Sequence, residues 1–150
     1  MFDVACVGIL VADAITKTVD KLPEKGKLSL VDSLRLYSGG CAANSAIDMA
    51  KIGADVAVIG IVGNDGFGSF LKNELLKYKV NTDGLICTDE ADTSASVALI
   101  DSKGERSFLH SIGANGVFAE KHIDYGIIEK SNIVFVAGSM LMPSFDGEDC

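Results

Sequence analysis

Apolar and polar residues along the chain alternate between patterns typical of buried strands and patterns typical of amphipathic helices. Nearly continuous apolar runs at residues 3–10, 56–62 and 133–137 indicate strands that are buried on both faces of a parallel sheet. Apolar residues recur at helical spacing over residues 41–52, 69–79 and 120–130, with Gly53 and Asp65 at cap positions. This order predicts an α/β body in which helices flank a parallel sheet.

Four other segments do not fit a sheet covered by helices. Residues 15–19, 28–37, 94–100 and 105–110 alternate with a period of two, which is typical of strands with one solvated face. The turn DSKG joins the last two as a hairpin, and the register shift across Asp32 and Ser33 predicts a β-bulge. We therefore expect a small accessory sheet beside the body.

The end of the chain predicts a longer domain. Pro143 opens a helical pattern that residues 147–150 do not complete, and three body strands would leave apolar edge surface uncovered. We expect the chain to be truncated, with residues 1–150 forming the N-terminal half of one α/β domain.

Composition and charge narrow the class of protein. The chain is 48% hydrophobic and 23% charged, a balance typical of soluble globular domains. Its net charge of -8 disfavours binding to nucleic acid or to anionic lipid, because both are repelled by the mean field. The N-terminus lacks a basic signal region, and no apolar run approaches the ~20 residues of a membrane span. We expect a cytoplasmic location.

The cysteines and histidines predict no metal site. Cysteines stand at positions 6, 41, 87 and 150, too far apart for a CxxC pair, and only two histidines are present. Nucleotide fingerprints are also missing, since neither GxGxxG nor GxxxxGK[ST] occurs. The loop GNDGFG at residues 63–68 could receive an anion at a helix start, but Asp65 would repel it and favours a simple N-cap.

Candidate binding residues gather around the first strand and the second motif. Asp13 follows the first predicted strand at the carboxyl edge, where its carboxylate could accept hydrogen bonds from a sugar diol or satisfy loop backbone. Gly39 and Gly40 would let a ligand approach backbone closely. Asn44, one turn into the next helix, offers a donor and an acceptor toward the same edge.

The ordered motifs carry a family resemblance. Asp13, GGCAAN at 39–44, GADVAVIGIVGNDGFG at 53–68, TSASVALIDSKGERSF at 93–108 and GAN at 113–115 resemble the N-terminal half of the ribokinase/PfkB family of carbohydrate kinases. The resemblance implies a ribokinase-like fold with a small β-sheet lid over the sugar. It also implies transfer of the γ-phosphoryl group of ATP to a hydroxymethyl group of a sugar or nucleoside, with Mg²⁺ and, in some relatives, a monovalent cation such as K⁺.

Site roles and a partner follow from the same resemblance. It implies that Asp13, Gly39, Gly40 and Asn44 bind the sugar and that Asn115 approaches the same pocket. Arg106 is a candidate contact for a substrate carboxylate or phosphate, with an exposed strand arginine as the alternative reading. The resemblance further implies a homodimer formed through the lid.

Two departures limit the prediction. Ribokinases resemble GSxNxD at the end of the first strand, whereas this chain has GILVAD at 8–13, with Val11 in place of the asparagine. Fructose, another hexose or ketose, a nucleoside or a deoxyketo acid is therefore favoured over ribose. The GAGD motif that supplies the catalytic base in the family is absent, so we expect that aspartate beyond residue 150 and no phosphoryl transfer by residues 1–150 alone.

Other functional classes stay open at this point. The chain could be a non-catalytic sugar- or nucleoside-binding module, or half of a two-chain assembly whose other chain supplies the base. A dinucleotide-binding oxidoreductase is disfavoured by the missing fingerprint.

Overall fold

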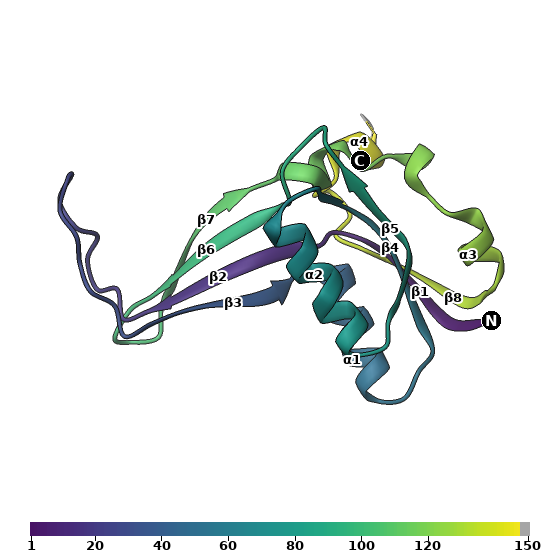
Figure 1. Cartoon of the computed structure of the whole chain (residues 1–150), viewed down its shortest axis with the longest axis horizontal. Coiled ribbons are helices and arrows are strands. Elements are labelled where there is room, and N and C mark those ends of the chain that lie inside the picture. The colour runs from purple at the N-terminus through teal and green to yellow at the C-terminus, as the bar shows by residue number, and fades with distance from the viewer. Residues whose placement is uncertain (148–150) are drawn as a thin grey trace.

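Two four-stranded sheets form the framework of the computed structural model, which describes residues 1–147. The body sheet is parallel throughout, and its strands run in the order β5 (Asn81–Thr88), β4 (Val56–Gly63), β1 (Phe2–Gly8), β8 (Ser131–Ala137). The second sheet, the lid, has the order β3 (Ser33–Gly39), β2 (Val11–Lys17), β6 (Ala95–Ile100), β7 (Arg106–Ser111). Only its β2–β6 pair is parallel. Figure 1 shows the lid as an arm that extends away from the body.

The chain crosses between the sheets at one corner. β1 ends at Gly8, and the chain enters the lid when β2 begins at Val11. β3 returns along β2 until Gly39 lies opposite Val11, and helix α1 (Cys41–Lys51) begins directly afterwards. The exit to the lid and the return from it are therefore neighbours in space.

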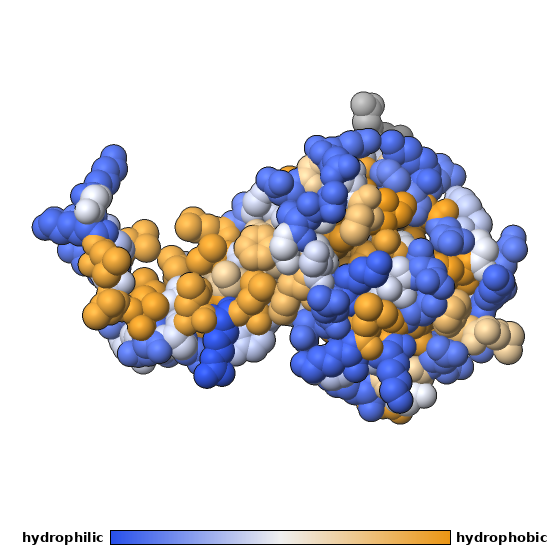
Figure 2. Space-filling model, viewed as in Figure 1, coloured by the Kyte–Doolittle hydropathy of each residue, from blue (hydrophilic) through white to orange (hydrophobic). Residues whose placement is uncertain are grey.

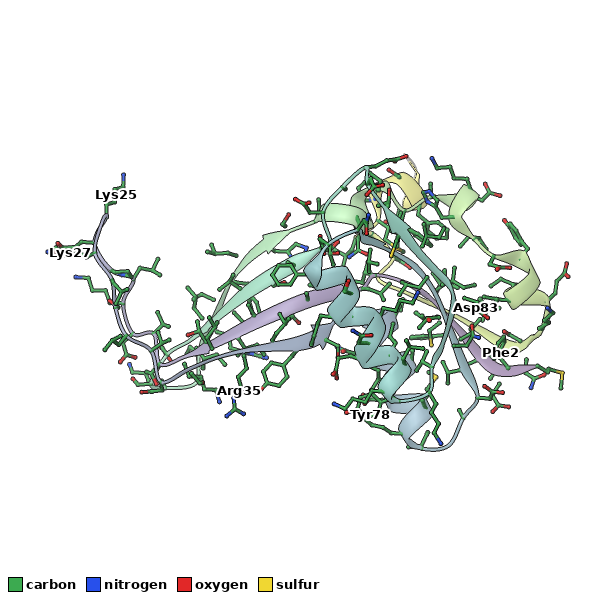
Figure 3. All side chains as sticks on the ribbon, in the orientation of Figure 1. Phe2, Lys25, Lys27, Arg35, Tyr78 and Asp83 are labelled. Atoms are coloured by element: carbon green, nitrogen blue, oxygen red, sulfur yellow. The ribbon has the colours of Figure 1, made fainter. Side chains whose placement is uncertain are left out.

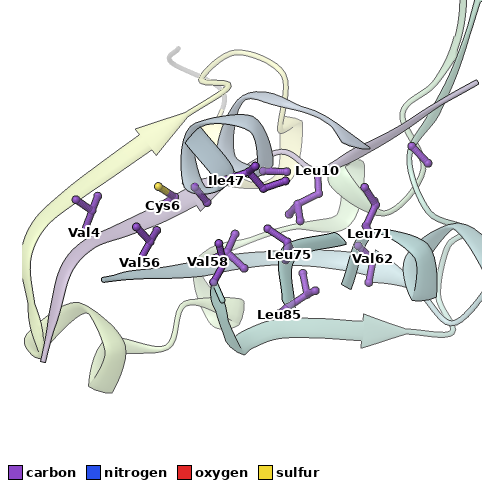
Figure 4. Packing of buried hydrophobic residues seen from close by; sticks show 14 residues of the cluster. Val4, Cys6, Leu10, Ile47, Val56, Val58, Val62, Leu71, Leu75 and Leu85 are labelled. Carbon is purple, nitrogen blue, oxygen red and sulfur yellow. The ribbon is translucent and has the colours of Figure 1, made fainter. Parts of the chain in front are cut away.

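Helices cover both faces of the body sheet, as the alternation of patterns predicts. On one face, α1 and α2 (Gly66–Lys77) pack their apolar residues against β1 and β4, and Figure 4 shows Ile47, Leu71 and Leu75 between the helices and the strands. On the other face, Phe118 and Met142 are fully buried. The segments on that face are η1 (Gly113–Val117), η2 (Glu120–His122), α3 (Tyr125–Glu129) and α4 (Pro143–Asp146). Each large apolar side chain that is fully buried contributes roughly 1.5–3 kcal/mol.

Two cap predictions are confirmed. Asp65 is the N-cap of α2, and its Oδ1 accepts a hydrogen bond of 2.8 Å from the amide of Gly68. The same carboxylate accepts from Thr93 at the start of the lid, with 2.7 Å between Thr93 N and Asp65 Oδ2. Gly53 follows the end of α1 with φ +99°, a conformation that glycine adopts without a steric penalty.

Several predicted boundaries are wrong. The lid strand predicted at 28–37 spans only Ser33–Gly39, and its register with β2 is continuous, so the bulge at Asp32 and Ser33 is absent. The strand predicted at 15–19 begins four residues earlier, at Val11. The helix predicted over 120–130 is divided into η2 and α3, since Asp124 caps a new helix by accepting from Ile127 N.

β5 escaped prediction altogether. Its sequence NTDGLICT lacks a continuous apolar run, because it pairs only with β4 at one edge of the body sheet. β8 was expected to be buried on both faces, yet Ile133 remains 59% exposed. The reason is topological, since β8 is the opposite edge and pairs only with β1. Within residues 1–147, no helix has the length and apolar character required to cross a bilayer.

Candidate functional site

The carboxylate of Asp13 lies directly over the backbone of Gly39. A Cβ added at Gly39 would overlap Asp13 Oδ2 and stand 2.7 Å from its Cγ. The sequence was interpreted as placing Asp13 directly after the first strand, but Asp13 is the third residue of lid strand β2. The contact therefore joins the two lid strands that lead into and out of the body.

Gly40 brings the start of α1 against the β1–β2 connection. It has φ +86°, and a Cβ there would lie 2.8 Å from Leu10 Cα. The amide of Ala42 donates to the carbonyl of Ile9 at 3.2 Å. As the N-cap residue, Gly40 has no side chain that could bond the remaining first-turn amides, and α1 has no side-chain cap.

Asn44 lies one turn into α1, close in sequence to that helix start. Its backbone amide bonds to the carbonyl of Gly40 at 3.0 Å, as in an ordinary helix. Its side chain is exposed and makes no hydrogen bond to any part of residues 1–147. Asn44 thus offers a free donor and a free acceptor.

Asp13 belongs to a row of polar residues across the lid that sequence reasoning missed in part. Strand register places Tyr37, Asp13, Ser96 and His110 side by side on β3, β2, β6 and β7. Ser96 Oγ and His110 Nδ1 are 2.9 Å apart. The turn DSKG alone would pair Ile100 with Glu105 and set Ser96 opposite Leu109, whereas the strands are joined by five residues and Ile100 pairs with Arg106. The pair was therefore missed because the loop is one residue longer than the turn that the sequence indicates.

The electrostatics of Asp13 fit a ligand-facing acid. Burial raises the pKa of Asp13 above its usual value, and the Ser96 hydroxyl and the nearby His110 oppose that rise. Because desolvation is the largest influence, the ionised carboxylate gains from any hydroxyl that donates to it. A polyhydroxylated ligand would supply such donors.

The side chain of Asn115 hydrogen-bonds to the backbone of Leu10. Its Nδ2 donates to the carbonyl of Leu10 at 2.9 Å, and its Oδ1 accepts from the amide of Leu10 at 3.2 Å. Both contacts are buried, and they hold the connection between β1 and β2 in place. Asn115 is therefore near the predicted pocket but acts on the chain that forms it.

Arg106 is not brought together with the other candidates. It shares the face of Asp13 but stands at the far end of β7, paired with Ile100. Four residues separate it from His110 along the strand, or roughly 13 Å. It is exposed, as the alternative reading held.

Metal ligands do not gather in the part of the chain that the structure describes. Residues 1–147 contain no cluster of three or more His, Cys, Asp or Glu side chains that could hold a metal ion. The site is thus a set of hydrogen-bonding groups at the corner where lid and body meet.

Comparisons with known proteins agree on one family. The family described as pfkB family carbohydrate kinase matches residues 1–150. Among curated proteins, the chain is 34% identical over 119 residues to probable fructokinase-6, chloroplastic, of Arabidopsis thaliana, covering 77% of this chain and 31% of that relative. Fructokinase-2 of Zea mays is 32% identical over 130 residues, covering 84% of this chain and 38% of the relative.

Solved structures show the same fold. A fructokinase with bound ATP from Xylella fastidiosa superposes with a TM-score of 0.75 at 27% identity, covering 91% of this chain and 42% of that one. The Arabidopsis thaliana ribokinase complexed with ribose and ATP gives a TM-score of 0.80 at 23% identity, covering 95% of this chain and 46% of that one. The ribokinase-like fold with its lid is thereby confirmed, and the chain spans less than half the length of these proteins.

Proposed function

The chain belongs to the pfkB family of carbohydrate kinases, and from this premise we propose that the gene product containing it phosphorylates a hydroxymethyl group of a sugar or nucleoside with ATP. Residues 1–150 supply the sugar-binding residues and the lid. The relatives named as fructokinases favour a ketose or another hexose over ribose. Val11 agrees with this preference, because it is apolar and buried on the lid face that carries Asp13.

The contact between Asp13 and Gly39 carries the proposal. It sets a partly desolvated carboxylate at the corner where α1 begins, and Asn44, one turn into α1, carries an exposed side-chain amide with no hydrogen bond within residues 1–147. An ionised carboxylate accepts hydrogen bonds only, whereas the α1 amides donate and Asn44 does both. Together they match adjacent sugar hydroxyls, each of which donates once and accepts as well.

In this mechanism the residues of the chain bind and orient. Asp13 fixes two hydroxyls, and the α1 start and Asn44 fix the other side, so that the reactive hydroxymethyl group has one position. The lid strands exclude water from that position. Positioning of this kind supplies a large share of the rate in phosphoryl transfer, which needs little covalent help from the protein.

ATP, Mg²⁺ and K⁺ are expected to bind through other groups. Residues 1–147 offer no acidic cluster for a metal, and the 150-residue sequence contains no GAGD aspartate. Bound Mg²⁺ would neutralise charge on the transferring phosphoryl group. We accordingly expect residues 1–150 alone to bind substrate without transferring a phosphoryl group.

The direct test is sugar-dependent release of ADP. The gene product containing this chain would be assayed with ATP, Mg²⁺ and a panel of D-fructose, other hexoses, D-ribose and nucleosides. Turnover with at least one member, lost in Asp13→Ala, is expected. No ADP release with any member would refute the function, and turnover by residues 1–150 alone would refute the placement of the base outside them.

The lid also supports a homodimer. Its face opposite Asp13 carries apolar side chains, of which Leu34 is 67% and Leu109 64% exposed. Figure 2 shows hydrophobic residues gathered along the lid arm. In Figure 3 the adjoining loop carries Lys25 and Lys27 beyond the tip of the lid. A second lid packed on this face would remove those apolar side chains from water.

A further inference from the structure

His110 stands at the outer end of the polar row on the lid and has no part in the function proposed above. It is exposed on β7, on the face that carries Asp13, and only Ser96 separates it from that carboxylate. Neighbouring strands are about 4.8 Å apart, so Asp13 and His110 stand on backbones roughly 10 Å apart with their side chains on the same face. A monosaccharide under the lid can bridge that span.

Ser96 stands between Asp13 and His110 in the row. Its Oγ lies 2.9 Å from His110 Nδ1, and its hydroxyl opposes the rise in the pKa of Asp13. An ionised carboxylate can only accept, so a Ser96 hydroxyl that donates to Asp13 accepts from Nδ1–H of His110. The neutral ring then presents Nε2 as an unprotonated acceptor. Within residues 1–147, no other hydrogen bond engages the ring.

We propose that His110 is a specificity-determining residue whose Nε2 accepts a hydrogen bond from a second hydroxyl of the substrate held by Asp13. The proposal rests on the sugar-binding function and names a contact within that site. Two acceptors on either side of Ser96 select a ligand with hydroxyl donors at both positions. A deoxy substrate at either position would leave one acceptor unpaired.

One test of the ring orientation needs no ligand. Long-range ¹⁵N correlation spectra of the gene product at about pH 7.5 report which ring nitrogen is protonated. We expect a protonated Nδ1 and a bare Nε2 at His110, and loss of that preference in Ser96→Ala. An Nε2–H form in the wild type would overturn the proposal whether or not a sugar binds.

A second test measures affinity for D-fructose by calorimetry. His110→Ala should raise the dissociation constant about tenfold, because it removes one acceptor. His110→Gln keeps an acceptor near the Nε2 position and should stay within about threefold of wild type. Ser107→Ala, on the opposite face of β7, is the matched control and should bind normally.

The outcomes distinguish failure of the His110 contact from failure of the proposed kinase function. Wild-type binding of D-fructose with unchanged affinity in His110→Ala would overturn the role of His110 and leave the kinase function standing. A wild type that binds none of D-fructose, D-ribose and adenosine would overturn both.

Discussion

The carboxylate of Asp13 occupies the space that a side chain at Gly39 would need. Gly39 is buried, and its φ lies outside the left-handed region, so backbone strain plays no part in the requirement for glycine. The constraint is steric and comes from the residue that is proposed to bind the sugar. A single methyl group at position 39 is thus a probe of the site.

Gly39→Ala is expected to displace Asp13 and weaken sugar binding. The added Cβ overlaps Asp13 Oδ2, so the carboxylate must rotate away, and we expect the dissociation constant for D-fructose to rise at least tenfold, with about 1–3 kcal/mol lost from the free energy of unfolding. Calorimetry and denaturant unfolding would measure the two effects. Gly116→Ala is the control, since its Cβ would meet Ile112 Cγ2 at an ordinary 3.5 Å. Normal affinity in Gly39→Ala would show that Asp13 does not hold the substrate.

Asp13→Asn should lower the affinity for sugar and should raise the stability of the protein relative to wild type as pH increases. Burial raises the pKa of Asp13, so between its ordinary value of 3.8 and the raised value the folded state binds more protons than the unfolded state. The contribution of this group to stability is therefore present at low pH and falls as pH rises through that window. The amide that replaces the carboxylate does not titrate, so the stability of the variant relative to wild type should increase from about pH 3.5 to about pH 7.

Denaturant midpoints at both pH values would check this sign. Repeating the comparison in His110→Gln removes the attraction that opposes the shift, and the pH effect should become larger. A variant whose relative stability decreased with pH would contradict the dominance of burial at Asp13. Sugar affinity should fall in Asp13→Asn throughout.

Two asparagines should respond in opposite ways to alanine. Asn115→Ala leaves the buried amide and carbonyl of Leu10 unpaired, and we expect a loss of about 2–3 kcal/mol in the free energy of unfolding. Asn44→Ala, on the exposed surface of α1, should change stability by no more than about 0.5 kcal/mol. The same change should weaken D-fructose binding about tenfold by removing a polar contact.

The pair acts as its own control. Unfolding and binding measured on both variants separate a residue that builds the site from one that touches the ligand. A stable Asn115→Ala protein, or an Asn44→Ala protein with normal affinity, would reverse the assignment of that residue.

The sequence predicted well what depends on local patterns. Buried strands β1 and β4 and the caps at Asp65 and Gly53 were found because continuous apolar runs and cap residues leave direct signals. β5 was missed because an edge strand with polar residues resembles a loop. β8 was found but its burial was overestimated, since a pattern cannot show which neighbours are present.

The residues of the site were predicted from motifs and the family resemblance, but their relative positions depend on the strand register of the lid. Asp13, Gly39 and Asn44 were named, yet the position of Asp13 inside β2 follows from pairing with β3 over the full length of the strand. His110 joined the site only through two cross-strand pairings. Asn115 reaches Leu10 across 105 residues of chain, a contact that no local pattern encodes.

The apolar face of the lid gives the last prediction. Leu109 lies on the face opposite Asp13, beside Val97 of β6, while the adjacent Phe108 lies on the face of Asp13. If two lids pair through the apolar face, Leu109→Asp would bury a charge in the interface and should shift the gene product from dimer to monomer. Phe108→Asp places the same charge one residue away on the other face and should leave the dimer intact. Light scattering at micromolar concentration would measure the mass of wild type and both variants. A wild type with the mass of a monomer would refute the lid interface.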